Sequence, residues 1–180
     1  MKEVEVKIIG INREQVEATL RSLGATKTFD GDEETLFFDF PDSSIARAKD
    51  LLRLRKIGDK KTVLTFKKFV NSETAKVREE HEVSVSGFEP MRLILESIGL
   101  SSTQQMEKHR TSYALKSGVT VDIDKYTGEF SHIPDLMEIE GGDLTIINSA
   151  AKLLGFKPEE CKAWTTFDLI DLYSKKKVKT

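Results

Sequence analysis

Residues 51–67 have the sequence LLRLRKIGDKKTVLTFK, and this stretch decides the fold class. Arg53 and Arg55 alternate with leucines, and the residues after the turn alternate between two kinds of side chain in the same way. A period of two is typical of a half-buried β-strand. Gly58-Asp59 lies where a tight hairpin turn would join two such strands. The stretch therefore predicts an antiparallel pair with one apolar face and one charged face.

The same alternation continues along the chain and predicts about eight strands. They cover residues 2–9, 34–40, 50–56, 61–69, 76–86, 105–115, 119–127 and 136–141. Most of them are separated by short turns, such as the one expected at Ser117-Gly118, and short turns join antiparallel neighbours. Eight strands are enough to close a barrel. We therefore expect an α+β fold built on an eight-stranded antiparallel β-barrel.

Four segments predict short amphipathic helices that would pack outside the strands. They are Asn12 to Leu23, Phe88 to Ile98, Asp143 to Leu154, and a less regular segment from Pro158 towards Tyr173. Each apolar stripe needs a sheet or another helix to cover it. The first strand and the helix that stops at Gly24 recur as a strand and a helix that stops at Gly99, which indicates a faint internal repeat.

The composition excludes several classes of protein. The 180 residues include 28 Lys+Arg and 30 Asp+Glu, so charge is abundant while the net charge is only −2. A general nucleic-acid binder is usually basic, and no apolar run approaches the roughly 20 residues of a membrane span. The single cysteine, Cys161, excludes an intramolecular disulfide and a cysteine-based zinc site. The two commonest glycine-rich phosphate loops are absent from the sequence as well.

The bulk properties also predict the organisation of the chain. We expect one domain over residues 1–174 and a basic tail over residues 175–180. The start Met1-Lys2-Glu3, without an apolar leader, predicts a cytoplasmic protein. We expect no nucleic-acid partner and no membrane partner, and either a monomer or a homodimer.

Charged residues gather on one face of the predicted strands. The acids are Glu3, Glu5, Glu80, Glu82, Asp122, Asp124, Glu138 and Glu140, and the bases are Lys7, Arg53, Arg55, Lys67, Arg78, Lys108 and Arg110. An ordinary solvated sheet face is the simplest interpretation. Such a face usually mixes Thr, Ser, Gln and Lys, whereas these positions are almost purely charged, and like charges repel one another two residues apart. Because the helices need the apolar face, the charged face would point inward.

Inward charges of both signs predict an interior that is either hydrated or filled by a charged ligand. Burying such groups without water or a partner costs several kcal/mol each. Carboxylates suit hard cations such as Mg²⁺ or Mn²⁺, while Arg and Lys suit phosphate oxygens directly. A triphosphate with two divalent cations would leave the total charge of such an interior unchanged.

Seven motifs in order resemble the CYTH superfamily, the triphosphate tunnel metalloenzymes, and within it the class IV adenylyl cyclase-like branch. They are Glu3-Val4-Glu5-Val6-Lys7, Leu52-Arg53-Leu54-Arg55, Thr65-Phe66-Lys67, Arg78-Glu79-Glu80-His81-Glu82, Lys108-His109-Arg110, Asp122-Ile123-Asp124 and Glu138-Ile139-Glu140-Gly141. The first motif alone is weak, but the ordered series across residues 3–140 is specific. The resemblance implies an eight-stranded antiparallel tunnel with a charged interior and short helices outside.

The resemblance also implies a role for each charged position. The triphosphate would be held by Lys7, Arg53, Arg55, Lys67, Arg78, Lys108 and Arg110, of which Lys7, Arg53, Lys67 and Arg110 would also act in catalysis. One or two Mg²⁺ or Mn²⁺ ions would be bound by Glu3, Glu5, Glu138 and Glu140, with Asp124 or Asp122 and Glu80 or Glu82 in support.

The implied reaction is the conversion of ATP to cyclic AMP and pyrophosphate, as in class IV adenylyl cyclases. Hydrolysis of tripolyphosphate, thiamine triphosphate or a nucleoside triphosphate is the alternative, since the same charged set would serve it. A non-catalytic binder of nucleotides or polyphosphate is a third hypothesis, against which the full acidic set argues. The link Thr127–Pro134 is longer than in many members, and Lys162 is best interpreted as a surface lysine.

Overall fold

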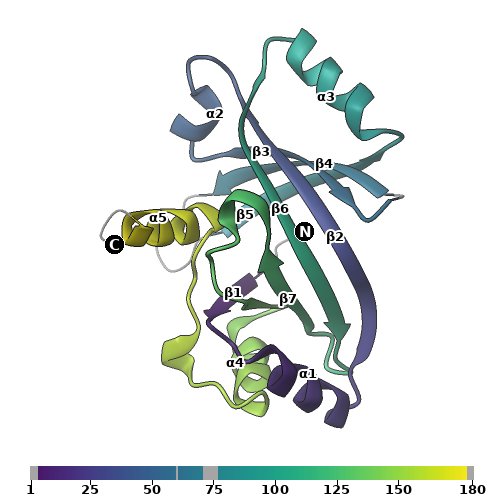
Figure 1. Ribbon diagram of the computed structural model, residues 1–180, viewed down its shortest axis with the longest axis vertical. Helices are drawn as coiled ribbons and strands as arrows, with labels where there is room; N and C mark the ends of the chain where they lie inside the picture. The colour runs from purple at the N-terminus through teal and green to yellow at the C-terminus, as the bar shows by residue number, and fades with distance from the viewer. Residues whose placement is uncertain (1–3, 60, 71–76, 178–180) are drawn as a thin grey trace. The chain divides into compact units, whose positions relative to one another are not determined.

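The computed structural model describes residues 4–59, 61–70 and 77–177 (Figure 1). Its strands are β1 (Val4–Ile9), β2 (Thr26–Asp39), β3 (Leu51–Ile57), β4 (Lys61–Val70), β5 (Val77–Val85), β6 (Ser101–Ala114), β7 (Thr120–Tyr126) and β8 (Leu136–Gly141). Its helices are α1 (Arg13–Ser22), α2 (Ser44–Arg47), α3 (Phe88–Ser97), α4 (Leu144–Leu153) and α5 (Thr166–Lys177), with 3-10 turns η1 (Gly128–Phe130) and η2 (Pro158–Glu160).

The strands form one eight-stranded sheet in the order β1-β8-β7-β6-β2-β3-β4-β5. The pairs β1·β8, β8·β7, β7·β6, β2·β3, β3·β4 and β4·β5 are antiparallel. The predicted antiparallel architecture with short helices is therefore confirmed. The turns expected at Gly58-Asp59 and Ser117-Gly118 do separate β3 from β4 and β6 from β7.

Several boundaries differ from those that the sequence predicts. The helix expected from Pro158 begins at Thr166, and only the short turn η2 forms at Pro158. β2 begins at Thr26 and β6 at Ser101, whereas residues 34 and 105 were the expected starts. The first residues of both strands are mostly exposed and polar, so they carry no apolar alternation. α5 extends to Lys177, and the boundary expected after residue 174 falls inside this helix.

The described chain divides into two compact units. Unit 1 comprises residues 31–107, and unit 2 comprises residues 4–30 and 108–177. The long strands β2 and β6 contribute residues to both units. Unit 1 holds β3, β4, β5, α2 and α3, while unit 2 holds β1, β7, β8, α1, α4 and α5.

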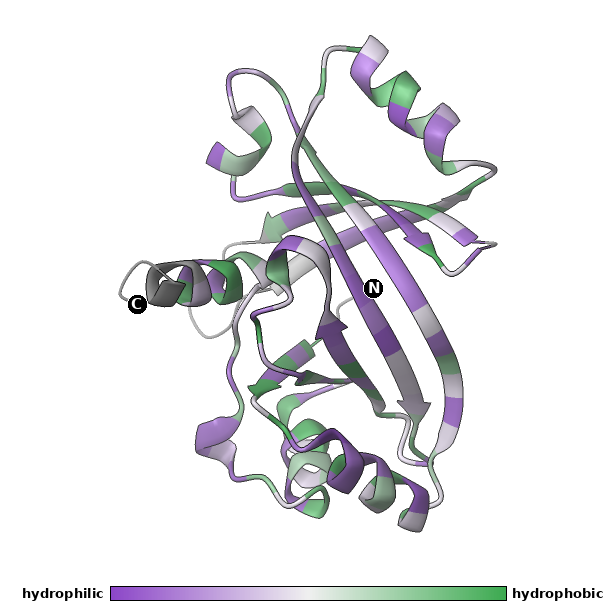
Figure 2. Cartoon of the chain, viewed as in Figure 1, coloured by the Kyte–Doolittle hydropathy of each residue, from purple (hydrophilic) through white to green (hydrophobic). Residues whose placement is uncertain are grey.

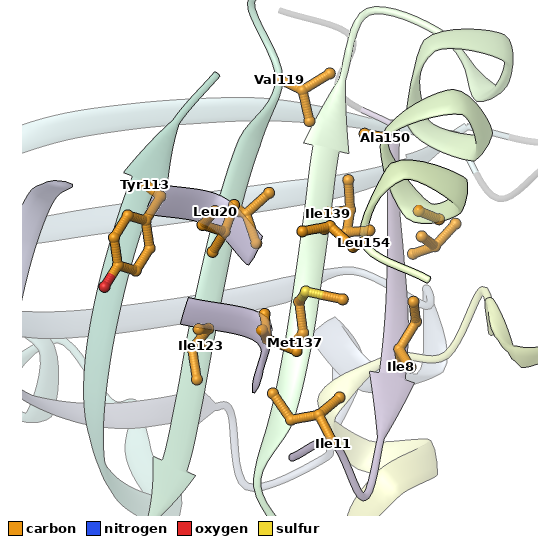
Figure 3. Packing of buried hydrophobic residues seen from close by; sticks show 14 of the residues in the cluster. Ile8, Ile11, Leu20, Tyr113, Val119, Ile123, Met137, Ile139, Ala150 and Leu154 are labelled. Carbon is orange, nitrogen blue, oxygen red and sulfur yellow. The ribbon is translucent and has the colours of Figure 1, made fainter. Parts of the chain in front are cut away.

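In unit 2, α1 and α4 supply apolar side chains to one face of the strands. Figure 3 shows Leu20 and Leu154 packed near Ile8, Met137 and Ile139, all of which are buried. Burying a side chain of this size stabilises the fold by roughly 1.5–3 kcal/mol. The helices thus cover the Val, Leu and Ile face of these strands, as the sequence predicts.

Unit 1 is built in the same way around α3. Leu36 and Leu54 from the sheet are buried with Leu95 of α3, and Phe88 and Met91 pack against them. Apolar and polar residues alternate along the strands in the hydropathy colouring of Figure 2. In each unit the charged side chains therefore lie on the strand face that the helices do not cover.

The internal repeat recurs at the level of whole elements. β1-α1-β2 is followed later by β5-α3-β6, in which α1 and α3 each have 10 residues and β2 and β6 each have 14. Gly24 and Gly99, which follow the two helices, have φ angles of +70° and +100°. Only glycine adopts this left-handed region without strain.

Among the described residues, no helix is long and apolar enough to cross a membrane.

A buried carboxylate at the end of β2 holds the segment that leads into α2. Asp39 is 6% exposed and accepts hydrogen bonds from the backbone N–H groups of Phe40 at 2.8 Å, Ile45 at 3.0 Å and Ala46 at 2.9 Å. These donors lose their acceptor if the carboxylate is removed, and a buried donor without an acceptor is costly. The Asp39 side chain therefore fixes this loop of unit 1.

We predict that Asp39→Ala lowers the free energy of unfolding by about 2–3 kcal/mol, because three backbone N–H groups lose their charged acceptor. Urea denaturation measures the change. The matched control is Asp42→Ala, which removes an exposed carboxylate that bonds Ser44 N at 3.0 Å and Arg47 at 2.9 Å. The control should cost less than about 1 kcal/mol. Equal losses in the two variants would contradict the structural role of Asp39.

Candidate functional site

Strand register gathers the predicted charges of unit 2 in rows across its face. Glu138 lies opposite Lys7 on one side and opposite Asp122 on the other. In the neighbouring rows, Arg110 lies opposite Asp124 and Glu5 lies opposite Glu140. Side chains that lie directly opposite have Cβ atoms about 4.5–5.5 Å apart, so the charges in one row interact directly.

Arg110 is the centre of this cluster. Its Nε and Nη2 atoms donate to the two carboxylate oxygens of Asp124 at 2.7 and 2.6 Å, which is the bidentate geometry. Nη2 also donates to Glu138 Oε2 at 2.6 Å, and Nη1 lies 2.6 Å from Asp122 Oδ2. Lys108 Nζ adds a 2.7 Å contact to Asp124 Oδ2. Three carboxylates thus converge on one guanidinium.

Lys7 is the second buried base of the cluster. Its side chain is 2% exposed, and its Nζ lies 2.9 Å from both Glu138 Oε1 and Glu5 Oε1. The Lys7 backbone exchanges two 2.8 Å hydrogen bonds with Lys162, so the segment after α4 pairs with β1 here. The Lys162 side chain is exposed and donates to the Glu159 carbonyl at 2.6 Å, in keeping with a surface lysine.

The ion pairs set the charge state of the buried groups. Burial alone would lower the pKa of Lys7, but Glu138 and Glu5 hold that pKa above its usual value. Burial alone would raise the pKa of Glu138, but Lys7 and Arg110 hold it well below its usual range. The pKa of Asp124 is lowered in the same way, because Lys108 and Arg110 outweigh burial.

Asp122 is in a different electrostatic state. Burial raises its pKa, and the nearby Arg110 guanidinium does not offset this effect. Its Oδ1 atom is buried and has no hydrogen-bond partner among the residues that the structure describes. The ionised form of Asp122 is therefore the least well satisfied of the three carboxylates that contact Arg110.

Unit 1 carries the remaining predicted bases. Lys67 forms an ion pair with Glu80, which lies directly opposite it on β5. Arg55 Nη1 lies 3.6 Å from Oε2 of Glu33, a buried acid on β2. Arg53 lies opposite the buried Thr65, whose hydroxyl donates to Glu82 at 3.1 Å. The basic strands β3 and β4 thus lie between strands that carry acids.

The two units have opposite arrangements of charge. Unit 1 has bases on its central strands β3 and β4, which are Arg53, Arg55 and Lys67, and acids on the flanking β2 and β5, which are Glu33, Glu80 and Glu82. Unit 2 has acids on its central strands β7 and β8, which are Asp122, Asp124, Glu138 and Glu140, and bases on the flanking β6 and β1, which are Lys108, Arg110 and Lys7. Glu5 is an acid on the flanking strand β1.

Two residues on these faces belong to none of the predicted motifs. Glu33 follows a polar, exposed stretch of β2, and nothing in its local pattern distinguishes it from Glu34. Tyr126 continues the alternation of Asp122 and Asp124, and this period of two was the signal that could have found it. Of the predicted residues, Glu3 lies outside the described residues, and the side chain of Arg78, opposite Phe69, lies outside them as well.

Like charges two residues apart do not by themselves require a ligand in this protein. The acids of β7 and β8 are neutralised across the strands by Arg110, Lys108 and Lys7. Within residues 4–59, 61–70 and 77–177, no group of three or more Asp, Glu, His or Cys side chains is arranged to hold a metal ion.

The acidic set nevertheless fits a hard cation in its chemistry. All of the candidate ligands are carboxylates, which Mg²⁺ and Mn²⁺ prefer. Asp122 Oδ1 is a buried oxygen without a hydrogen bond from a described residue. Glu5 lies directly opposite Glu140, and two carboxylates in this arrangement repel one another. The metal-binding residues remain a prediction.

The lowered pKa of Glu138 predicts how stability depends on pH. The native state keeps Glu138 ionised at pH values where the unfolded chain binds a proton, so stability is present above pH ~4.3 and is lost as pH falls further. In Glu138→Gln this proton uptake is absent, and the loss per pH unit between pH 4 and 3 should be smaller by up to about 1.4 kcal/mol.

Urea unfolding at a series of pH values measures both slopes. The exposed Glu107 supplies the control, because Glu107→Gln removes a carboxylate outside the cluster and should keep the wild-type slope. Parallel curves for the wild type and Glu138→Gln would show that Glu138 is not held ionised.

Comparison with known proteins identifies the fold. No curated protein sequence matches the chain. A conserved hypothetical protein from Pyrococcus furiosus has 27% identity and a TM-score of 0.75, over 93% of this chain and 99% of that one. A candidate adenylate cyclase from Vibrio parahaemolyticus has 16% identity and a TM-score of 0.78, over 94% and 97% of the two chains. A candidate adenylyl cyclase from Hippeastrum, described as having a dominant triphosphatase activity, has 17% identity and a TM-score of 0.66, over 93% of both chains.

A match to a family model identifies the family of the chain. A model of the CYTH domain family matches residues 1–152, which include all of β1 to β8. The eight-stranded antiparallel sheet with short helices agrees with this match. The chain therefore belongs to the CYTH domain family.

Proposed function

We propose that this protein is a metal-dependent enzyme that acts on a triphosphate, and that its reaction converts ATP to cyclic AMP and pyrophosphate. The observation that carries the proposal is the opposite arrangement of charge in the two units, with bases on the central strands of one and acids on the central strands of the other. Bases suit the phosphate oxygens of a triphosphate, and carboxylates suit the divalent cations that accompany it.

The bases of unit 1 would bind phosphate oxygens. Arg55 supports this role, because its Nε is a buried donor that has no hydrogen-bond partner among the described residues. A buried donor without an acceptor costs roughly 1–3 kcal/mol, which a bound anionic oxygen would recover. Arg53 on β3 and Lys67 on β4 lie on the same face of the sheet, because Arg53 is opposite Thr65, two residues before Lys67.

The acids of unit 2 would bind the metal ion through Glu5, Asp122, Glu138 and Glu140, together with the predicted Glu3. A bound Mg²⁺ or Mn²⁺ ion supplies positive charge that polarises phosphoryl oxygens. Metal ligands must be deprotonated, and the ion pairs with Lys7 and Arg110 keep the pKa of Glu138 low. The carboxylate therefore stays in its binding form at neutral pH.

The chemistry requires stabilisation of charge more than proton transfer. In the cyclase reaction, the ribose 3′-hydroxyl oxygen bonds to the α-phosphorus of ATP while the bond to the departing pyrophosphate breaks. The proton of the hydroxyl passes to water or to the pyrophosphate. Negative charge grows on the leaving oxygens, and fixed positive groups stabilise it. Lys7, Arg53, Lys67 and Arg110 are the residues to which we assign this role.

Triphosphate hydrolysis is the second candidate function. Water would attack the terminal phosphorus and release orthophosphate, and the same bases would offset the same kind of charge. The fold is compatible with this reaction, since the Hippeastrum protein of similar fold is described as having a dominant triphosphatase activity. The resemblance of the whole motif series to the cyclase-like branch puts ATP cyclisation first.

The products formed from three substrates test the proposal. We expect cyclic AMP and pyrophosphate when the protein is incubated with ATP and Mg²⁺ or Mn²⁺, and no product when EDTA removes the metal. Parallel incubations contain tripolyphosphate or thiamine triphosphate, and chromatography separates the products. Orthophosphate as the main product would establish the triphosphatase instead. Binding without any product would contradict an enzymatic function.

Asp122→Asn tests the metal assignment separately from folding. We expect at least a tenfold rise in the Mn²⁺ concentration for half-maximal turnover, because each carboxylate ligand contributes charge to the site. The binding of Mn²⁺ in the presence of tripolyphosphate, followed by electron paramagnetic resonance, should weaken in parallel. The free energy of unfolding should change by less than about 1 kcal/mol, since burial already disfavours the ionised form of Asp122.

Glu107→Gln is the control for this variant, because it removes a negative charge from an exposed position. It should leave the Mn²⁺ dependence unchanged. If Asp122→Asn keeps the wild-type Mn²⁺ affinity and turnover, Asp122 is not a metal ligand.

A further inference from the structure

Tyr126 lies on the charged face of unit 2, although no sequence motif includes it. It is the last residue of β7 and follows Asp122 and Asp124 at alternate positions, so the three side chains share one face. The strand register places it directly opposite Lys108 on β6. A phenol thus stands beside a base to which the proposed function assigns a phosphate contact.

The Tyr126 side chain is almost completely buried within the charged cluster. The residue is 3% exposed, and its hydroxyl makes no hydrogen bond to another residue that the structure describes. The charges that act on it come from Lys108, Glu138, Asp124 and Lys7, so it lies within the cluster. A neutral phenol can donate a hydrogen bond.

The hydroxyl of a tyrosine that is largely buried usually has a hydrogen-bond partner. The nearby carboxylates already accept hydrogen bonds from Arg110, Lys108 and Lys7. An anionic oxygen attracted by Lys108 would supply the missing acceptor. A phosphate oxygen has the charge and the accepting capacity that this position lacks.

We propose that the Tyr126 hydroxyl donates a hydrogen bond to a phosphate oxygen of the triphosphate bound by Lys108. This inference rests on the proposed function and adds a substrate-binding residue to it. Because the hydroxyl is uncharged, its hydrogen bond would orient the phosphate group without changing the net charge of the site.

The neighbouring strand supplies a matched comparison. Tyr113 on β6 is 2% exposed, but it belongs to the apolar core that the helices cover (Figure 3). Both tyrosines are buried in unit 2 and lie on opposite faces of the same sheet. Removing the hydroxyl from each therefore separates an effect on ligand binding from a general effect on packing.

The test compares Tyr126→Phe with Tyr113→Phe. Calorimetry with Mg²⁺ and tripolyphosphate should show roughly 10- to 100-fold weaker binding in Tyr126→Phe, the loss expected for a hydrogen bond to a charged oxygen. KM should rise by a similar factor, with a smaller change in kcat. Urea unfolding should show little change in the stability of the ligand-free variant, because the hydroxyl makes no hydrogen bond to another described residue. Tyr113→Phe should bind tripolyphosphate like the wild type.

Three outcomes would overturn the inference. If the wild type binds and Tyr126→Phe binds equally well, the hydroxyl does not contact the substrate, while the proposed function stands. If Tyr126→Phe loses stability in proportion to its loss of binding, the hydroxyl has a structural role. If the wild type binds neither tripolyphosphate nor ATP nor thiamine triphosphate, the proposed function fails and the inference fails with it.

Discussion

The guanidinium of Arg110 lies among the carboxylates of Asp124, Glu138 and Asp122, and the charged face of unit 2 depends on this contact. Three acids on adjacent strands would otherwise raise one another's pKa and bind protons. Removing the Arg110 guanidinium would take the shared cation from all three acids, and an uncompensated buried charge costs about 3–5 kcal/mol. The pKa of Glu138 is held low by Lys7 together with Arg110, and that of Asp124 by Lys108 together with Arg110.

The same contact constrains how the site can work. Arg110 occupies the place among the carboxylates that a cation would take, so its proposed role on phosphate requires the guanidinium to leave at least one acid. Asp122 is the acid for which this change is least costly, because burial already disfavours its charge and its Oδ1 has no hydrogen-bond partner among the described residues. On binding of a metal–triphosphate complex, the metal ion would replace Arg110 as the partner of the carboxylate, and a phosphate would become the partner of Arg110. Each buried charge would then keep a partner of opposite sign.

The alternation of residues was sufficient to predict the fold but not the pairing of its charges. Arg53 and Arg55 identify β3 because their leucine neighbours need a core, whereas the start of β2 is exposed and offers no such contrast. The short helix α2 escaped prediction because it depends on Asp39, which lies outside it. That Glu138 meets Lys7 follows from strand register, and register depends on contacts distant in sequence. The sequence predicts which charged residues share a face of the strands, and the structure adds which of them lie opposite one another on neighbouring strands.

The strand order explains how one chain can present two faces of opposite character. Exchanging β1–β4 with β5–β8 converts the order β1-β8-β7-β6-β2-β3-β4-β5 into its own reverse, so the two halves are equivalent in topology. The equivalent strands β3 and β7 differ in sign, with Arg53 and Arg55 on β3 and Asp122 and Asp124 on β7. Successive side chains of a strand point to opposite faces, so such a change of sign leaves the apolar face and its helices unaffected. A duplicated unit could therefore have kept its core while one copy became suited to anions and the other to cations.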